Sequence, residues 1–296
     1  MKNIDEKIKD YRCKKSEKFQ KYIDEINEKN DFERRIIPTS YGNVTIDIYH
    51  SLMKKSPVYF NFHGGGFVLG YHELDGPYCK ILREKANCTV INIDYLLAPE
   101  YKFPIPVYSS YEVITWCLKH ADELGIDAEN FVIGGHSAGG NLSAGVTYLL
   151  LNNNKQGQKG LIMDYAPCTQ DIAHISDLDD DKKIEIDRSL QYMLWYFDKQ
   201  EDIQHPLASI CNLNVKNFPN TFMISAEFDP LFQGERIFKR NLERSHVNIE
   251  CHVFLGCHHG FTHQYYDEYR EDKANEAWHL MADFLIKSFD KTKKEA

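Results

Sequence analysis

Basic residues are in the minority in this 296-residue chain, which has 35 Lys and Arg against 44 Asp and Glu and a formal net charge of −9 at pH 7. Proteins that bind nucleic acid gather Lys and Arg on one face, because these residues neutralise the phosphate backbone. The acidic balance therefore argues against nucleic acid as a partner. Hydrophobic residues at 43% indicate an ordinary globular chain, and we expect a single domain over residues 1–296.

Long apolar runs are also missing from the sequence. No stretch approaches the roughly 20 apolar residues that a membrane-spanning helix needs. The first residues, Met1–Lys7, are charged and lack the apolar core of a signal peptide. We therefore expect no membrane insertion and a cytoplasmic location.

Closely spaced cysteines are absent as well. The eight cysteines are scattered and form no Cys-x-x-Cys pair. This argues against a structural zinc site and against a dense disulfide scaffold, and it suits a reducing compartment.

The chain does contain a serine between a strand-like and a helix-like segment. Residues 131–134 are apolar and β-prone, residues 138–152 are helix-prone, and Gly135-x-Ser137-x-Gly139 lies between them. This pattern is typical of a nucleophile elbow, a sharp turn that strains the serine backbone and brings strand and helix too close for β-carbons at the glycines. The alternative role for Ser137 is that of a helix N-cap.

Strand and helix patterns alternate along most of the chain. Strands are predicted at 58–62, 88–94, 131–134, 160–165, 221–225 and 247–254, and helices at 73–86, 106–124, 138–152, 231–245 and 270–289. Residues 34–50 alternate with period two around a turn, which predicts an antiparallel hairpin at a sheet edge. The alternation favours right-handed crossovers, and so a mostly parallel central sheet with helices on both faces.

Two segments do not fit this alternation. Residues 1–30 are highly charged and carry a narrow apolar stripe, which is typical of one or two docking helices. They form either a solvated extension or part of a lid. Residues 169–216 read as a helical insertion with an aromatic cluster at 192–197, for which we favour packing against the body over a substrate cage.

A nucleophilic serine needs a histidine base that is held in place by a carboxylate. The predicted strand 221–225 is followed by Glu227 and Asp229, and the strand 247–254 by His258 and His259. The chain order serine, acid, histidine is one known order for such a triad. Spacing alone does not separate the two neighbouring histidines, and it leaves Glu227 as a weaker rival of Asp229.

The oxyanion of a tetrahedral intermediate is best held by preorganised backbone N–H groups. Ala138, directly after the serine, offers one. The loop His63-Gly64-Gly65-Gly66 after strand 58–62 offers more, because only glycine lets the backbone approach closely enough. We expect His63 to anchor this loop by hydrogen bonds.

Together these motifs resemble the hormone-sensitive-lipase-type esterases of the α/β-hydrolase superfamily. The matching stretches are 63–67, 94–100, 135–140, 205–209, 229–231 and 259–261. The resemblance implies an α/β-hydrolase fold with Ser137 as nucleophile, His259 as base and Asp229 as the orienting acid.

The resemblance also implies Gly64, Gly65 and Ala138 as oxyanion donors, and a helical cap formed by residues of about 1–32 and 169–216. The implied reaction is hydrolysis of short- to medium-chain carboxylic esters through an acyl-enzyme, with no metal and no organic cofactor. The alternatives are an amidase, formamidase or peptidase with the same triad, and a ligand-binding protein without turnover. A homodimer is left open.

Three residues depart from the family pattern. His136 stands where the family usually has Asp, Leu96 where it has Arg, and Gln233 where a second Asp often follows the acid. None of these changes removes a catalytic role, and we expect His136 to be structural.

Overall fold

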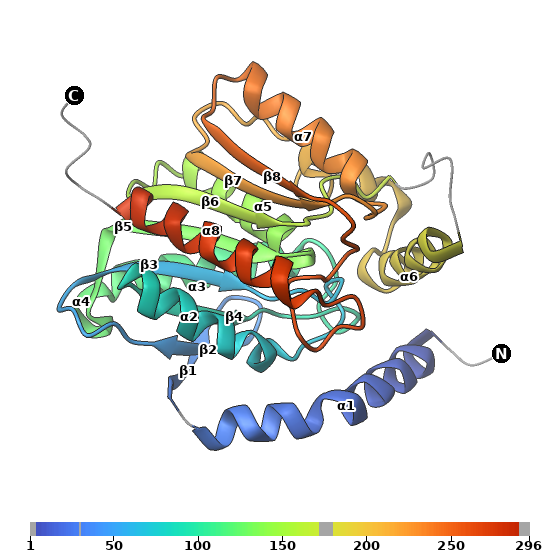
Figure 1. Cartoon of the computed structure of the whole chain (residues 1–296), viewed down its shortest axis with the longest axis horizontal. Helices are drawn as coiled ribbons and strands as arrows, with labels where there is room; N and C mark the ends of the chain where they lie inside the picture. The colour runs from blue at the N-terminus through green and yellow to red at the C-terminus, as the bar shows by residue number, and fades with distance from the viewer. Residues whose placement is uncertain (1–3, 30, 172–179, 290–296) are drawn as a thin grey trace.

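The sheet that organises the molecule has eight strands in the order β1-β2-β4-β3-β5-β6-β7-β8, as the computed structural model of residues 4–29, 31–171 and 180–289 shows (Figure 1). The strands are β1 (Glu33–Pro38), β2 (Asn43–Tyr49), β3 (Ser56–Phe62), β4 (Thr89–Asp94), β5 (Ile126–His136), β6 (Gln158–Asp164), β7 (Asn220–Ala226) and β8 (Ile249–Phe254). β1 and β2 form the predicted antiparallel hairpin at one edge, β2 also pairs antiparallel with β4, and the strands β3 to β8 are parallel to one another. The predicted fold class is confirmed.

Helices cover both faces of this sheet (Figure 1). Their bounds are α2 (Gly76–Ala86), α3 (Ile105–Lys119), α4 (Ala121–Leu124), α5 (Ala138–Asn152), α7 (Phe232–Arg244) and α8 (Glu271–Phe289). Short 3-10 turns are η1 (His72–Asp75), η2 (Gln200–Gln204) and η3 (Ile210–Asn212). α2 packs beside α8, and α3 packs beside α5.

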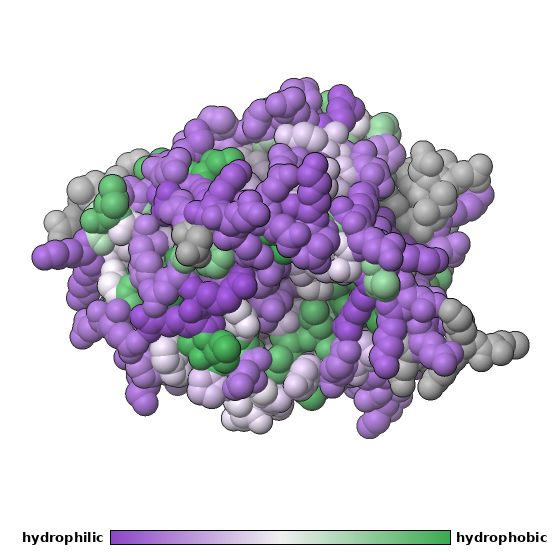
Figure 2. Space-filling model, turned by 90° about the horizontal axis from the view of Figure 1, so that it is seen from below, coloured by the Kyte–Doolittle hydropathy of each residue, from purple (hydrophilic) through white to green (hydrophobic). Residues whose placement is uncertain are grey.

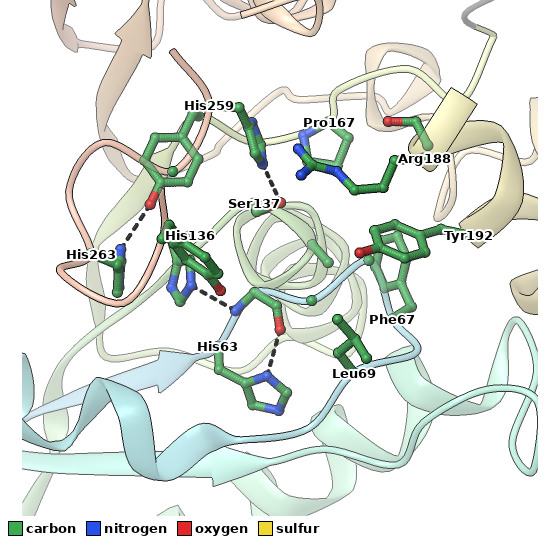
Figure 3. A pocket seen from close by; sticks show the side chains of 18 of the residues that line it. His63, Phe67, Leu69, His136, Ser137, Pro167, Arg188, Tyr192, His259 and His263 are labelled. Atoms are coloured by element: carbon green, nitrogen blue, oxygen red, sulfur yellow. Dashed lines mark hydrogen bonds between the residues drawn. The ribbon is translucent and has the colours of Figure 1, made fainter. Parts of the chain in front are cut away.

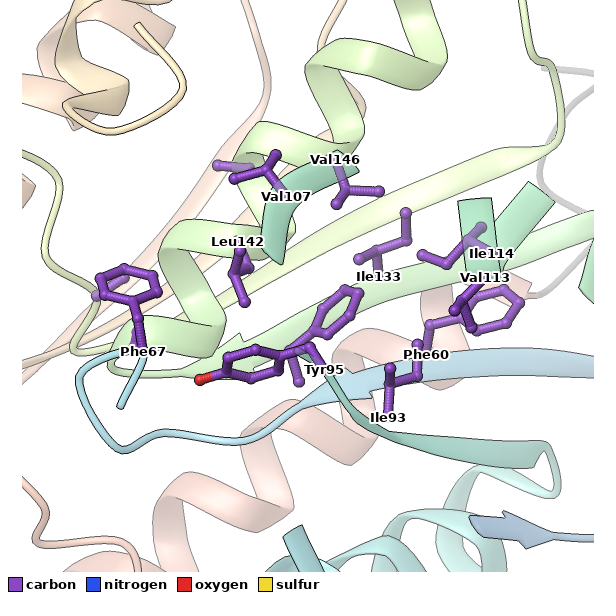
Figure 4. Packing of buried hydrophobic residues seen from close by; sticks show 14 of the residues in the cluster. Phe60, Phe67, Ile93, Tyr95, Val107, Val113, Ile114, Ile133, Leu142 and Val146 are labelled. Atoms are coloured by element: carbon purple, nitrogen blue, oxygen red, sulfur yellow. The ribbon is translucent and has the colours of Figure 1, made fainter. Parts of the chain in front are cut away.

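The core is divided by the sheet because side chains along a strand alternate between its faces. Phe60 of β3 and Ile133 of β5 point to the side of α3 and α5, where they join Leu142 (Figure 4). Tyr59 and Val132, one residue earlier in each strand, join the cluster on the other side. Burial on both faces explains why these strands are almost continuously apolar.

Two further helices, α1 (Ile4–Lys29) and α6 (Asp180–Tyr196), complete the fold. α1 is a single helix that docks through buried Ile8, Phe19, Ile23 and Ile26. Its Arg12 also donates a hydrogen bond from Nε to the carbonyl oxygen of Val68 at 2.8 Å. α1 is therefore packed on the body and is not a solvated extension.

The surface on the side of α1 is largely hydrophilic, with small hydrophobic patches among polar side chains (Figure 2). No helix within the described ranges is long and apolar enough to cross a bilayer.

Candidate active site

The turn between β5 and α5 has the geometry of a nucleophile elbow. Ser137 has φ 51° and ψ −124°, a strained conformation for a residue with a β-carbon. A β-carbon at Gly135 or Gly139 would lie 2.3 or 2.0 Å from the carbonyl oxygen of Phe62. Strand, turn and helix can come this close only because both positions are glycine.

Ser137, His259 and Asp229 come from three separate loops and form one chain of hydrogen bonds. Figure 3 shows the bond between Ser137 and His259. The distance from Ser137 Oγ to His259 Nε2 is 2.9 Å, and that from His259 Nδ1 to Asp229 Oδ2 is 2.6 Å. Asp229 is buried, and its other oxygen accepts the N–H of Leu231 at 2.8 Å. With Nδ1–H donated to the carboxylate, Nε2 of the neutral ring is the acceptor for the serine hydroxyl.

The neighbouring candidates lie outside this chain of hydrogen bonds. Glu227 is exposed and accepts the N–H of Gly256 at 2.8 Å. His258 packs against the ring of Phe228, with 5.3 Å between the ring centroids. The structure therefore places Asp229 and His259 in the hydrogen-bonded chain with Ser137, and Glu227 and His258 outside it.

The glycine loop is held at both the N–H and the carbonyl group of Gly64. The N–H of Gly64 donates to His136 Nε2 at 3.0 Å, and the carbonyl of Gly64 lies 2.6 Å from His63 Nδ1 (Figure 3). The expected anchoring role of His63 is confirmed. The Gly64 N–H is thus bound inside the protein in this structure, and Gly64 as an oxyanion donor stays a prediction.

The next two glycines continue the loop into the cavity. Gly65 has φ 114° and Gly66 has φ 62°, and a β-carbon on Gly66 would lie 2.0 Å from Tyr192. Both residues line the cavity together with Ala138. Gly64 lines the same cavity.

A layer of histidines lies behind the glycine loop, and sequence reasoning did not identify its second member. The His136 ring stacks on that of His263 with 3.8 Å between centroids. His263 Nδ1 lies 2.8 Å from the hydroxyl of Tyr165, whose ring contacts His259 edge-on. Burial lowers the pKa of His136 well below 6.5 and that of His263 to about 3, so both rings are neutral near pH 7. In the sequence, the only indication of His263 is that it is a third histidine close after His258 and His259.

Asp75, His136 and His263 are the described residues whose geometry comes nearest to a metal site, with ligand atoms within 4.8 Å of one another. A neutral imidazole has one nitrogen that accepts and one that carries a proton. His136 Nε2 accepts the N–H of Gly64, so Nδ1, which lies 3.5 Å from Asp75 Oδ2, carries the proton. A protonated nitrogen has no lone pair for a metal, and this geometry favours a hydrogen-bonded cluster.

The cavity in front of Ser137 is bounded by parts of the chain that are far apart in sequence. Its walls include the glycine loop, the elbow, the triad loops, α1 and α6. α1 and α6 also contact each other, since the hydroxyls of Tyr11 and Tyr192 lie 2.8 Å apart. Tyr196 stacks on Phe67 at 4.1 Å. The aromatic cluster of α6 therefore both packs on the body and lines the cavity.

Comparison with known proteins agrees with the fold. The sequence profile of the family described as "alpha/beta hydrolase fold" matches residues 59–263. An arylesterase of Saccharolobus solfataricus is 35% identical over 224 residues, which cover 71% of this chain and 72% of that protein. An acetyl esterase of Salmonella paratyphi B is 27% identical over 244 residues, which cover 77% of this chain and 72% of that protein.

Among solved structures, the chain is similar to a hyperthermophilic esterase from the archaeon Pyrobaculum calidifontis. The two share 26% sequence identity and superpose with a TM-score of 0.82. The match covers 95% of this chain and 93% of the other.

Proposed function

Since this chain belongs to the α/β-hydrolase fold family, in its hormone-sensitive-lipase-type branch, we propose that it hydrolyses carboxylic esters through an acyl-enzyme formed on Ser137. The observation that carries the proposal is the hydrogen-bonded chain from Ser137 through His259 to Asp229. The names of the similar proteins, an arylesterase and an acetyl esterase, support the same bond type.

Acylation begins when His259 Nε2 takes the proton of the Ser137 hydroxyl while Oγ bonds to the ester carbonyl carbon. The carbonyl oxygen becomes an oxyanion, and the N–H groups of Gly65, Gly66 and Ala138 stabilise it. Asp229 stabilises the imidazolium that has formed.

The tetrahedral intermediate then collapses. Protonated His259 gives its proton to the leaving alkoxide as the carbon–oxygen bond breaks, and the acyl group stays on Ser137. Water then attacks the acyl carbon with His259 again as base, and the carboxylic acid and free Ser137 are released.

We further propose that α1 and the segment 169–216 form a cap over the acyl site within one domain. Lys15 and Phe19 of α1, and Tyr192 and Met193 of α6, line the cavity and support this assignment. Residues 172–179 of the segment lie outside the described ranges. The aromatic walls favour short to medium acyl chains, because rigid rings limit the length of a bound chain.

The assignment of Ser137 is tested by the variant Ser137→Ala. We expect hydrolysis of p-nitrophenyl acetate to fall by a factor of about 10⁴ or more, since the triad acts as a unit. Steady-state rates measure the effect, and an unchanged melting temperature shows that the variant is folded. A variant that retains wild-type turnover would refute the assignment.

The substrate range is tested by p-nitrophenyl esters with acyl chains from C2 to C12. We expect the highest kcat/KM at short to medium length, and little activity on emulsified long-chain triglyceride. A p-nitroanilide of the best acyl group separates an esterase from an amidase, because the amide has the poorer leaving group. A cytoplasmic location remains a prediction from the sequence, which left the oligomeric state open.

A further inference from the structure

The segment that follows the glycine loop is folded back onto it. The carbonyl oxygen of Gly65 accepts the N–H groups of Val68 at 3.1 Å and of Leu69 at 2.9 Å. This carbonyl belongs to the same planar peptide group as the N–H of Gly66, one of the groups proposed to stabilise the oxyanion, so the orientation of one sets that of the other. Phe67 and Leu69 line the cavity on this segment (Figure 3). The direction of the Gly66 N–H therefore depends on what holds residues 67–69.

One side chain of α1 fastens this segment to a second turn of the chain. Arg12 donates from Nε to the carbonyl oxygen of Val68 at 2.8 Å, and from Nη2 to the carbonyl oxygen of Ala98. The N–H of Ala98 donates in turn to the carbonyl oxygen of Phe67 at 2.9 Å. Nη1 of Arg12 pairs with Glu100 at 2.7 Å. A guanidinium group suits this bridge because its N–H donors are fixed in one plane and meet several acceptors at once.

The two carbonyl bonds and the ion pair of Arg12 differ in their exposure to water. Val68 and Ala98 are buried, and the Arg12 side chain is 25% exposed, whereas that of Glu100 is 55% exposed. A hydrogen bond from a charged donor to a shielded carbonyl is stronger than an exposed ion pair, which water and salt screen. The carbonyl bonds therefore dominate the attachment of Arg12.

We propose that Arg12 is a positioning residue for the oxyanion, because through Val68 it holds the glycine loop in the orientation in which its N–H groups meet the carbonyl oxygen of the substrate. This inference rests on the proposed ester hydrolysis and adds a residue of α1 to it. Lys15 and Phe19 of the same helix line the cavity, so α1 supplies part of the wall and fixes the loop at the same time.

The variant Arg12→Gln tests this role with p-nitrophenyl acetate. An oxyanion forms in both acylation and deacylation, so a misplaced loop slows both steps. We expect kcat to fall by about tenfold, which is less than the 10²–10³ that the loss of a whole oxyanion donor costs. KM should change by less than about threefold, because the lost interaction is made in the transition state. Arg12→Lys should retain part of the rate, since its ammonium group can bind one of the two carbonyl groups.

Two control variants separate the carbonyl bonds from other contacts of α1. Glu100→Gln removes the charged partner of Arg12 and leaves the carbonyl groups of Val68 and Ala98 in place. Lys18→Gln removes an ion pair of the same helix, with Asp267 at 2.8 Å, that does not involve the glycine loop. Both variants should keep kcat within about twofold of the wild type.

Inhibition by phenylboronic acid gives a measurement that does not depend on turnover. Its boron becomes tetrahedral when Ser137 Oγ bonds to it, and one hydroxyl on boron takes the place of the oxyanion. The inhibition constant should rise by about tenfold in Arg12→Gln, because a transition-state analogue reports the same interactions. It should stay at the wild-type value in Lys18→Gln.

Two results would overturn the role of Arg12. One is a rise in KM with unchanged kcat in Arg12→Gln, since Arg12 would then only fasten the cavity wall. The other is an equal loss of kcat in Arg12→Gln and Lys18→Gln. Melting temperatures show that each variant is folded, and Arg12→Lys provides the same comparison if Arg12→Gln is unstable. Wild-type hydrolysis of p-nitrophenyl acetate would leave the proposed function in place in either case.

Discussion

His136 shows how one side chain can define a loop that is distant in sequence. It stands directly before Ser137, where the family usually has Asp, and its Nε2 accepts the N–H of Gly64, 72 residues away. Because the ring is buried and neutral, it acts as an acceptor without bringing a charge beside the oxyanion loop. The glycine pattern alone could not show that the Gly64 N–H is bound inside the protein, since that bond depends on His136.

The role of His136 can be tested by two substitutions at this position. His136→Leu leaves a buried N–H without an acceptor, at a cost of about 1–3 kcal/mol, and frees the loop to turn. We expect kcat to fall by about tenfold or more. In His136→Gln the side-chain oxygen can replace Nε2, and most of the activity should remain.

Steady-state kinetics on p-nitrophenyl acetate, together with melting temperatures, measure both variants. If His136→Leu and His136→Gln lose the same activity, the hydrogen bond to Gly64 does not position the loop.

At the scale of elements, the βα units were predictable and their bounds were nearly right. Strands such as β3 and β4 were recognisable because burial on both faces makes them continuously apolar. β5 was predicted too short, since its first part, from Ile126, carries polar residues that end the apolar pattern. The docking of α1 could not be predicted, because a narrow apolar stripe does not specify the surface that it contacts.

The close contact between β3 and α5 leads to a prediction about two glycines of the same helix. A β-carbon at Gly139 would lie 2.0 Å from the backbone of Phe62, whereas one at Gly145 would lie 3.3 Å from the side chain of Val107. Gly139→Ala should lower the free energy of unfolding by about 3 kcal/mol, because backbone must move. Gly145→Ala should change it by less than about 1 kcal/mol, since alanine favours the helix.

Urea titration of both variants measures the difference. Equal stabilities would show that the elbow can relax around a β-carbon at Gly139.

At the scale of the whole molecule, buried neutral histidines make stability depend on pH. Burial lowers the pKa of His63 to about 4 and that of His263 to about 3, from 6.5 in the unfolded chain. Below pH 6.5 the unfolded chain therefore binds protons that the folded protein does not, and stability falls as the pH falls. Each of these histidines contributes roughly 2–3 kcal/mol to the loss by pH 4.5.

The variant His263→Gln removes one of these titrating groups. Its free energy of unfolding should decrease less between pH 7.5 and 4.5 than that of the wild type, in urea titrations at both pH values. Asp75, whose pKa burial raises to about 7, acts in the opposite direction and is present in both proteins. His279→Gln changes an exposed position of α8 and serves as the control. Its free energy of unfolding should decrease between the two pH values by as much as that of the wild type. If the free energy of unfolding of His263→Gln decreased as much as that of the wild type, the prediction would be contradicted.

The hydrogen bond between Tyr11 and Tyr192 joins α1 to α6, whose positions in the sequence are far apart. Two walls of the cavity are thus supplied by one segment before the sheet and one inserted within it, while Ser137, Asp229 and His259 lie on the sheet's own loops. If the proposed cap selects the substrate, a chimaera that takes the α1 segment from another member of the family keeps the triad chemistry and changes the esters that it accepts.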